Sequence, residues 1–514
     1  MIKSFNNTVK FRFMFVVTVL FLLVTGFFYK STALSFPFVD EQYNFAIGKY
    51  LTKGEILYDD IITNHQPITH ILSALVQEVK NPNTTFSLLV AHRVAVAIWS
   101  GIWALVIVTY FGIGGFLFVV LYELTKSYMF GNLFLAESIV VYPLLFIVGV
   151  VLYRKTLNKL TLIILGISLT LTFFTLGPIW PALAFLGSLL IFQLKNYSKQ
   201  KLLYLFLAIL AVAFLVGKYS SFTGYIYNYL FLNFVYTIPA YHASYYREPW
   251  IATILKAFAS PLFSFIRTDV TSILWIIRLL SIMLIINIIY LIQRGKLRWA
   301  LMLVVLLGLS NIRFVSPGVG SYGGFHLLPW YSVLIFVSLL VSTEQFKQNV
   351  GRLFKIITIV IITASFLAGL SYAKEALFVK SDLQKEYTTN YSTHTDIGQI
   401  INIMKNPEDT LFVSPDAWLV YWQSDTHHPP KLFGYYAWTS GIPEFHKKIH
   451  ELFNKNPPTF FYCEDCKGLD LGQFLTQYKE IKKNGGSTHL FVLPSRIENQ
   501  TNLQSERLKF YGID

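Results

Sequence analysis

The chain is organised around residues 36–70, FPFVDEQYNFAIGKYLTKGEILYDDIITNHQPITH, which follow the first apolar run of the sequence. Asp40 and Glu41 open this stretch, and Pro67 can begin a second helix after His65 and Gln66. Between them, one set of apolar residues recurs at helical spacing: Tyr43, Ala46, Ile47, Tyr50 and Leu51. Because carboxylates held against a membrane are costly unless they serve a function, we interpret the stretch as an active-site loop.

The composition indicates a membrane protein. Of 514 residues, 54% are hydrophobic and 14% are charged, whereas ordinary globular chains are about a quarter charged. Apolar runs long enough to cross about 30 Å of hydrocarbon recur through the first 373 residues. The net charge of +14 comes mostly from clusters at the ends of these runs, so we expect no nucleic-acid partner.

Eleven membrane-spanning helices are predicted, with the N-terminus in the cytoplasm and the C-terminus outside. This arrangement keeps the basic clusters between spans on the cytoplasmic side. The first run is expected to be a retained anchor, because it is too long for the apolar core of a typical signal peptide. The predicted spans cover residues 12–34, 88–110, 111–125, 133–153, 160–176, 179–194, 202–217, 271–293, 298–312, 326–342 and 355–373.

The predicted fold class is a polytopic α-helical membrane protein with a small extracytoplasmic α/β domain. The membrane part covers residues 1–373, with outer loops at 35–87 and 218–270, and the α/β domain covers 374–514. In that domain amphipathic helical patterns alternate with short apolar strands such as TLFVSP, PTFFYC and THLFVLP. We expect disorder from Ile497 onward, and a small structural disulfide between Cys463 and Cys466 rather than a redox pair.

Under this topology the candidate acidic residues meet at the outer face of the membrane. Each also has a purely structural interpretation. Asp40 can cap its helix, Glu137 can complement the positive end of its helix, and Asp60, like its neighbour Asp59, can form a turn. Glu123 is expected to form only a local pair with Lys126.

A complementary set of basic residues is predicted at the same face: His65, Arg93, Arg313 and His326. An arginine near the end of a span can simply extend its side chain to the lipid headgroups. The alternative is a phosphate site, because the guanidinium offers a planar fork of donors. Some of the abundant aromatic residues belong to an interfacial belt, and others can line a site for a sugar or a prenyl chain.

These residues together resemble the GT-C superfamily of membrane glycosyltransferases, and within it the bacterial protein O-mannosyltransferase and aminoarabinose-transferase (family 39-like) group. The resemblance is most specific in the first outer loop and weaker in the later segments, and it covers about 370 residues. His65-Gln66-Pro67 departs from the paired proline that relatives often have. The matching positions are Asp40, Glu41, Tyr43, Ala46, Gly54, Tyr58, Asp60, His65, Gln66, Pro67, Arg93, Glu137, Arg313 and His326.

The resemblance implies an inverting glycosyltransferase that uses a polyprenyl-phosphate-linked sugar donor in the bacterial plasma membrane. Asp40 would be the general base, supported by Glu41, with Glu137 as a second acid. Arg93, and Arg313 or His326, would hold the phosphate. The acceptor would be a protein, a lipid or a glycan, membrane lipids would surround the chain, and no cofactor or catalytic metal is expected.

Other classes of protein are alternatives. A transporter or flippase of lipid-linked sugars would place charges near the middle of the membrane. The interiors of the predicted spans carry few charges, and Arg278 is the main exception. A non-catalytic assembly protein would have no reason to gather carboxylates in the first loop. A GT-C ligase that transfers a whole glycan is the closest rival.

Overall fold

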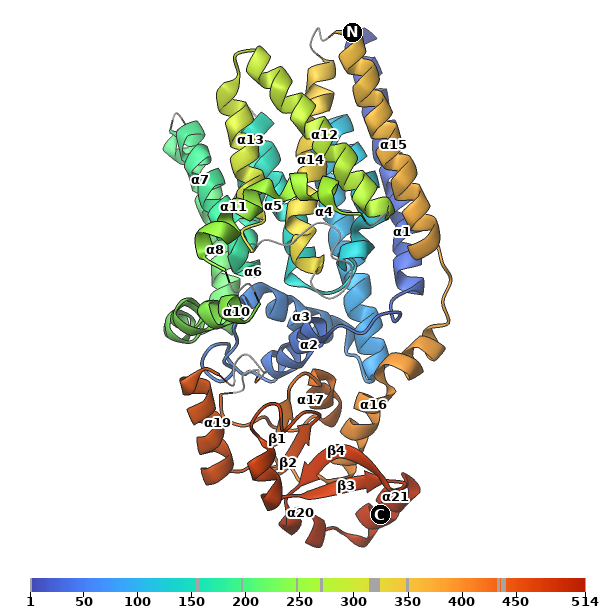
Figure 1. The fold of residues 1–514 in the computed structure, drawn as a ribbon, viewed down its shortest axis with the longest axis vertical. Coiled ribbons are helices and arrows are strands. Elements are labelled where there is room, and N and C mark those ends of the chain that lie inside the picture. Colours follow the sequence, from blue (N-terminus) through green and yellow to red (C-terminus); the bar gives the residue numbers. More distant parts are fainter. Residues whose placement is uncertain are drawn as a thin grey trace. The chain divides into compact units, whose positions relative to one another are not determined.

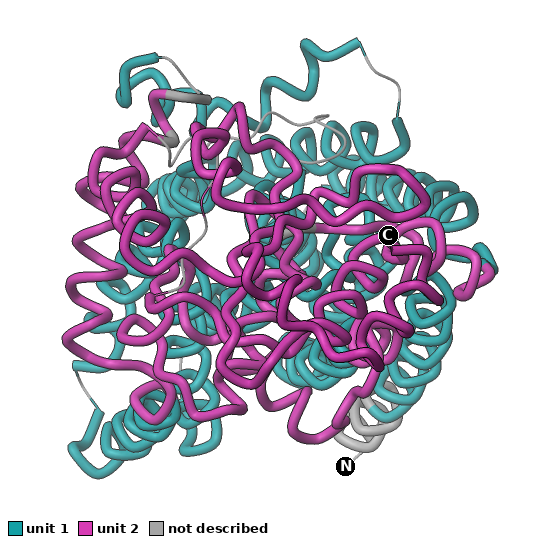
Figure 2. The backbone as a smooth tube through the Cα atoms, turned by 90° about the horizontal axis from the view of Figure 1, so that it is seen from below, with its two compact units in different colours: residues 1–33, 92–215, 248–381 teal, residues 34–91, 216–247, 382–514 magenta. Residues whose placement is uncertain are grey.

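A computed structural model describes residues 2–153, 157–195, 197–245, 248–268, 271–313, 324–347, 351–431, 435 and 441–513, without the side chains of 2–11, 39, 241 and 244–245. The described residues form two compact units, coloured teal and magenta in Figure 2. Unit 1 comprises residues 1–33, 92–215 and 248–381, and unit 2 comprises residues 34–91, 216–247 and 382–514.

Unit 1 is helical (Figure 1). Eight helices of the described residues are long and apolar enough to cross a membrane, and the protein is a multi-pass membrane protein. Unit 1 holds, wholly or mostly, α1 (Ile2–Ser31), α4 (Thr85–Thr125), α5 (Ala136–Tyr153), α6 (Lys159–Thr175), α7 (Trp180–Leu194), α8 (Lys199–Tyr219), α11 (Trp250–Ile266), α12 (Ser272–Gln293), α13 (Leu297–Ser310), α14 (Leu328–Phe346) and α15 (Arg352–Ala376).

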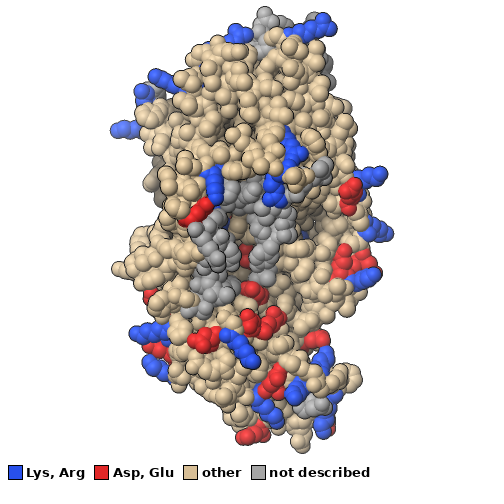
Figure 3. All heavy atoms as spheres, viewed as in Figure 1, with Lys and Arg blue, Asp and Glu red and all other residues tan. Residues whose placement is uncertain are grey.

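Burial separates central helices from peripheral ones. The apolar windows of α5 and α14 are 89% and 94% buried, whereas those of α1 and α15 are 17% and 22% buried. Uncharged residues dominate the surface over α12, α13 and α15 (Figure 3). Apolar side chains on such a surface match a hydrocarbon environment.

Helix α4 contains the predicted turn between the second and third spans. Gly112 has φ +58°, outside the helical range. A Cβ on Gly115 would lie 2.6 Å from the carbonyl oxygen of Ile107, although eight residues of straight helix would separate the two by about 12 Å. The chain therefore reverses at Gly112, as only a residue without Cβ does readily. The total number of spans stays a prediction.

Arg278, the charge that the transporter alternative would use, has a structural role in unit 1. Its Nε donates to the carbonyl oxygen of Ser264 at 2.8 Å, and its Nη2 donates to that of Arg267 at 2.5 Å. These carbonyls belong to the C-terminal end of α11, where helical acceptors lack partners within the helix. The predicted outer loop 218–270, in which α11 lies, is thus largely helical.

Unit 2 joins the predicted first outer loop to the C-terminal α/β part. Its four-stranded sheet has the order β1-β2-β4-β3, with β1 parallel to β2 and the other pairs antiparallel. Its elements are α2 (Val39–Thr52), α3 (Pro67–Lys80), α9 (Phe222–Gly224), π-helical turns at Tyr225–Phe231 and Asn233–Thr237, α10 (Ile238–Tyr245), α16 (Leu383–Met404), β1 (Leu411–Ser414), α17 (Trp418–Ser424), α19 (Pro443–Lys455), β2 (Phe460–Cys463), β3 (Lys479–Lys483), β4 (Gly486–Val492), α20 (Pro494–Glu498) and α21 (Asn502–Phe510).

The α/β part agrees with the sequence in its three apolar strands, and the predicted disulfide joins Cys463 to Cys466. The prediction of disorder from Ile497 onward is wrong, because the chain forms α21 there. A capping box of Thr501 and Gln504 starts this helix, and Leu508 is buried. A polar segment can therefore fold when its first turn is capped and one apolar residue is buried.

Candidate active site

Asp40 and Glu41 lie in the first turn of α2, whose N-cap is Phe38. The interpretation of Asp40 as an N-cap is therefore wrong. Negative charge in a first turn is favoured by the helix dipole, so both carboxylates suit this position electrostatically. Glu41 is fully buried, whereas Asp40 is only partly buried. Of the two, Asp40 is the carboxylate that a substrate can approach.

Tyr43 forms the centre of an aromatic cluster one turn further along α2. Its ring meets those of His65, His70 and Trp418, with centroids 5.2, 5.7 and 4.4 Å away. Burial raises the pKa of the Tyr43 hydroxyl, although a hydrogen bond with Thr63 opposes this shift. Tyr43 therefore stays a neutral donor at physiological pH.

Two members of this cluster, His70 and Trp418, were not predicted as site residues. Burial and the nearby His65 lower the pKa of His70, so its ring is neutral at pH 7. Neither ring nitrogen of His70 has a hydrogen-bond partner among the described residues. His70 could have been recognised from the sequence, because it lies on the buried face of α3. Nothing in the local sequence around Trp418 indicates that this residue would contact Tyr43.

The part of the loop between α2 and α3 contacts the aromatic segment that follows α8 and begins the π-helical turn at Tyr225. The Tyr58 hydroxyl donates to the carbonyl oxygen of His65 at 2.9 Å, and Tyr225 donates to Oε1 of Gln66 at 3.2 Å. The rings of Tyr58 and Tyr225 also meet edge to face, 5.3 Å apart. Asp60 is exposed and accepts a hydrogen bond from the Ile56 amide at 2.8 Å, which is the turn-forming role.

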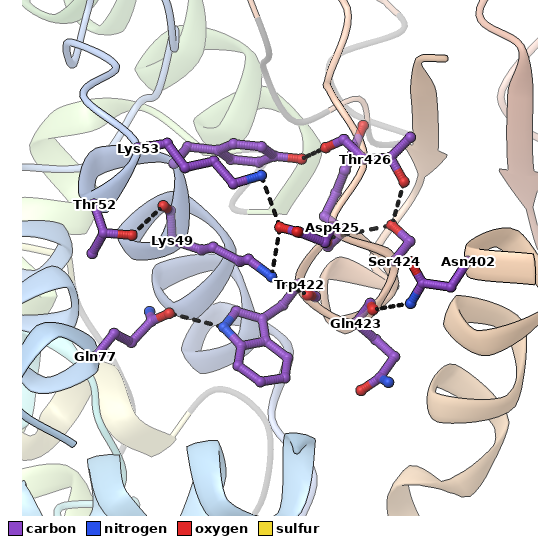
Figure 4. A network of polar contacts seen from close by, with 12 residues as sticks. Lys49, Thr52, Lys53, Gln77, Asn402, Trp422, Gln423, Ser424, Asp425 and Thr426 are labelled. Carbon is purple, nitrogen blue, oxygen red and sulfur yellow. Dashed lines mark hydrogen bonds and ion pairs between the residues drawn. The ribbon is translucent and has the colours of Figure 1, made fainter. Parts of the chain in front are cut away.

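Ion pairs and hydrogen bonds connect α2 and α3 to α17 of the α/β part (Figure 4). Lys49 of α2 and Lys53, which follows this helix, each lie 2.8 Å from Asp425, and Trp422 donates to Gln77 of α3 at 2.8 Å. Although burial opposes it, hydrogen bonding to the two lysines lowers the pKa of Asp425 to about 2. The α/β part is thus a direct support of the candidate catalytic loop.

Unit 1 brings three other predicted residues together, Glu137 from the first turn of α5, Arg313 and His326. Oε1 of Glu137 lies 3.5 Å from Nη1 of Arg313 and 3.3 Å from Nδ1 of His326. The Arg313 and His326 nitrogens are 2.9 Å apart. Glu137 is 5% exposed, so its charge requires such partners, because an unpaired buried carboxylate is strongly disfavoured.

The Arg313 contact is compatible with one tautomer of a neutral His326 ring. A guanidinium can only donate, so Nδ1 of His326 accepts from Arg313 in the tautomer that carries its proton on Nε2, and in that tautomer Nδ1 cannot also donate to Glu137. The cluster also lines a narrow cavity of about 10 Å³, room for about one water molecule. The cavity is bounded further by Leu176, Pro178, Ile179, Ser310, Asn311, Ile312 and Pro329.

The other predicted membrane residues have structural partners. Arg93 is 3% exposed and donates to the carbonyl oxygen of Ala33, two residues after the end of α1. Glu123 and Lys126 form the predicted local pair, with 2.7 Å between Nζ and Oε2. This pair is fully buried, and Tyr142 also donates to Glu123 at 2.6 Å.

The chain is thus a polytopic helical membrane protein in which residues 34–91 pack with a small α/β part. No family model and no curated protein matches it. Among solved structures it is similar to ArnT from Cupriavidus metallidurans in the apo state, with 12% identity and a TM-score of 0.47 over 93% of this chain and 97% of that chain.

Two further solved structures are similar to the chain. ArnT from Cupriavidus metallidurans bound to undecaprenyl phosphate has 11% identity and a TM-score of 0.49, over 93% of this chain and 97% of that chain. The Archaeoglobus fulgidus oligosaccharyltransferase in complex with Zn and sulfate has 12% identity and a TM-score of 0.47, over 94% and 74% of the two chains.

Proposed function

We propose that this protein is an inverting glycosyltransferase that moves a sugar from a polyprenyl phosphate to an acceptor on the outer face of the membrane. The observation that carries the proposal is the pair of carboxylates in the first turn of α2, of which Asp40 is accessible and Glu41 is buried. The resemblance of the loop 36–70 to GT-C enzymes supports the same reaction.

The proposed reaction is a single displacement at the anomeric carbon of the donor sugar. The acceptor hydroxyl or amine attacks this carbon while its proton passes to Asp40, which must lie within hydrogen-bond reach of it. The bond from the anomeric carbon to the phosphate oxygen breaks, and the electron pair leaves with the polyprenyl phosphate. One displacement inverts the configuration at that carbon.

Charge develops on the departing phosphate, and fixed cationic donors stabilise it best. Arg313 is a donor of this kind and is paired with Glu137, and the Nε2–H of His326, held by Arg313 through Nδ1, is a neutral donor beside it. Arg93 is a further candidate for the phosphate, and Tyr43 and His65 are candidates for the walls of the sugar site. No nucleotide-binding loop is needed, because the donor is already a lipid.

The decisive experiment compares sugar transfer by the wild type, Asp40→Asn and Asp59→Asn in membranes supplied with labelled polyprenyl-phosphate sugars. Asp59 is an exposed carboxylate of the same loop and provides a matched control. We expect Asp40→Asn to lower transfer by about 100-fold or more, the usual contribution of a general base. We expect Asp59→Asn to transfer sugar as the wild type does.

Two results would count against the proposal. Equal transfer by Asp40→Asn and Asp59→Asn, at equal amounts of inserted protein, would remove Asp40 from the reaction. A wild type that transfers none of a broad set of hexosyl and pentosyl donors would exclude a polyprenyl-phosphate sugar as its substrate.

A further inference from the structure

Helix α19 places two histidines one turn apart beside its buried stripe. Phe445, Ile449 and Phe453 are buried and fix the orientation of the helix. His446 and His450 each follow a residue of that stripe, so they emerge at the edge of the buried face on the same side of the helix. Their ring centroids are 4.0 Å apart.

The segment after β2 brings a carboxylate to these histidines. Asp470 has φ +56°, a left-handed conformation that few residues other than glycine adopt. Leu469 and Leu471 are buried on either side of it, and the Leu471 amide donates to the Cys466 carbonyl at 2.8 Å. The backbone at Asp470 is thus held by packing and hydrogen bonds in a conformation that is costly by itself.

The three side chains have the spacing of ligands around one metal ion. One ligand atom from each of His446, His450 and Asp470 lies within 4.8 Å of the other two. The His446 Nε2 to Asp470 Oδ2 distance is 3.2 Å, and ligands about 2.05 Å from a tetrahedral zinc ion are separated by about 3.3 Å. Little movement is needed for an ion to replace the direct contact between these two atoms.

The surroundings keep this geometry in place. His450 packs edge to face on Phe474, 5.0 Å between centroids, and Phe474 stacks on the buried Phe453 at 4.7 Å. The amide nitrogen of Gln473 donates to the Asp470 carbonyl oxygen at 3.3 Å. Such supporting contacts orient metal ligands before the ion binds.

We propose that His446, His450 and Asp470 bind a divalent transition-metal ion of the zinc type. Imidazole nitrogens favour Zn²⁺ and its neighbours, whereas Mg²⁺ and Ca²⁺ prefer sites made of oxygen ligands. The His446 and Asp470 side chains are 39% and 68% exposed, so water completes the coordination. The ion would link α19 to the segment after β2, and its binding is independent of the glycosyltransferase proposal.

The test titrates the full-length protein in detergent with Zn²⁺ against a chromophoric zinc chelator. The wild type should hold one more equivalent of Zn²⁺ than the double variant His446→Ala/His450→Ala. The control is His489→Ala, an exposed histidine of β4, and it should keep that equivalent. Zn²⁺ should also raise the melting temperature of the wild type and of the control more than that of the double variant.

A second variant protects the result from misfolding. Asp470→Asn should fold normally, because Asn also tolerates a left-handed conformation, and it should bind Zn²⁺ about tenfold more weakly. Visible absorption bands of bound Co²⁺ would report the same site directly. Equal zinc stoichiometry and affinity in the wild type and the double variant, or Co²⁺ bands that persist unchanged in the double variant, would overturn the proposal.

Discussion

At the residue scale, the cluster of Glu137, His326 and Arg313 is joined by one arginine nitrogen. A lysine at 313 would keep the charge but would replace a planar fork of donors with a single ammonium group. We expect Arg313→Lys to lower kcat/KM for the lipid donor about tenfold, the loss of about 1.4 kcal/mol of transition-state stabilisation. Arg298→Lys, an exposed position on α13, is the control. Equal kcat/KM in the two variants would remove Arg313 from phosphate binding.

Asp416 offers a prediction about pH. Burial, and then the charge of Glu464, raise the pKa of Asp416 to about 6, above its value of about 3.9 in an unfolded chain. Between these values the folded state keeps a proton that the unfolded state has lost, so stability falls as pH rises from about 4 to 6. At pH 7 the folded state therefore carries the full loss of stability that comes from ionising Asp416.

Replacing Asp416 by Asn should remove this penalty. At pH 7 we expect Asp416→Asn to raise the free energy of unfolding by about 1–2 kcal/mol, and below about pH 4 we expect no difference from the wild type. Thermal unfolding of the full-length protein at both pH values measures this. A variant that is less stable than the wild type at pH 7 would contradict the argument and would indicate that the charged form of Asp416 is needed.

At the scale of elements, the attachment of α2 to α17 depends on Asp425 and its two lysine partners (Figure 4). Asp425 has φ +51°, and Asn tolerates this conformation, so Asp425→Asn removes charge without changing the turn. Half of the Asp425 side chain is exposed, so solvent screening limits the expected loss of stability to about 1 kcal/mol.

Two dependences distinguish this electrostatic effect from a packing defect. The difference between wild type and Asp425→Asn in melting temperature should shrink in 1 M salt, where the Debye length is about 3 Å. Because the pKa of Asp425 is lowered to about 2, the stabilisation is present above about pH 4 and is lost as the pH falls towards 2. A difference that is independent of salt would contradict the ion-pair account.

The elements that could be predicted are those with a strong local pattern. The apolar spacing from Tyr43 to Leu51 predicted α2, and Pro67 predicted the start of α3. Strand β3 was missed, because only Ile481 of its five residues is buried and the others are charged. The approach of His326 to Glu137 joins residues 189 positions apart, and no local spacing encodes such a contact.

At the scale of the whole molecule, the predicted topology determines which parts of the chain face the outside. The positive-inside rule predicts that the first outer loop is extracytoplasmic and that the reversal at Gly112 is cytoplasmic. The chain has two cysteines, and they are joined to each other, so a single introduced cysteine can be labelled selectively. Val79 on α3 and Ile113 after the reversal are 79% and 48% exposed and suit this purpose.

We expect Val79→Cys to react with a membrane-impermeant maleimide in intact cells and Ile113→Cys to react only after the membrane is permeabilised. The second predicted span is the only complete one between the two positions, and Ile113 lies at the predicted cytoplasmic end of the third. Opposite labelling therefore requires that the first part of α4 crosses the membrane. Labelling of both cysteines in intact cells would show that the chain does not cross the membrane between positions 79 and 113. The prediction that the reversal at Gly112 is cytoplasmic would then be wrong. Labelling of Ile113→Cys alone in intact cells would invert the topology and would place Asp40 on the cytoplasmic side, where transfer to an external acceptor is impossible.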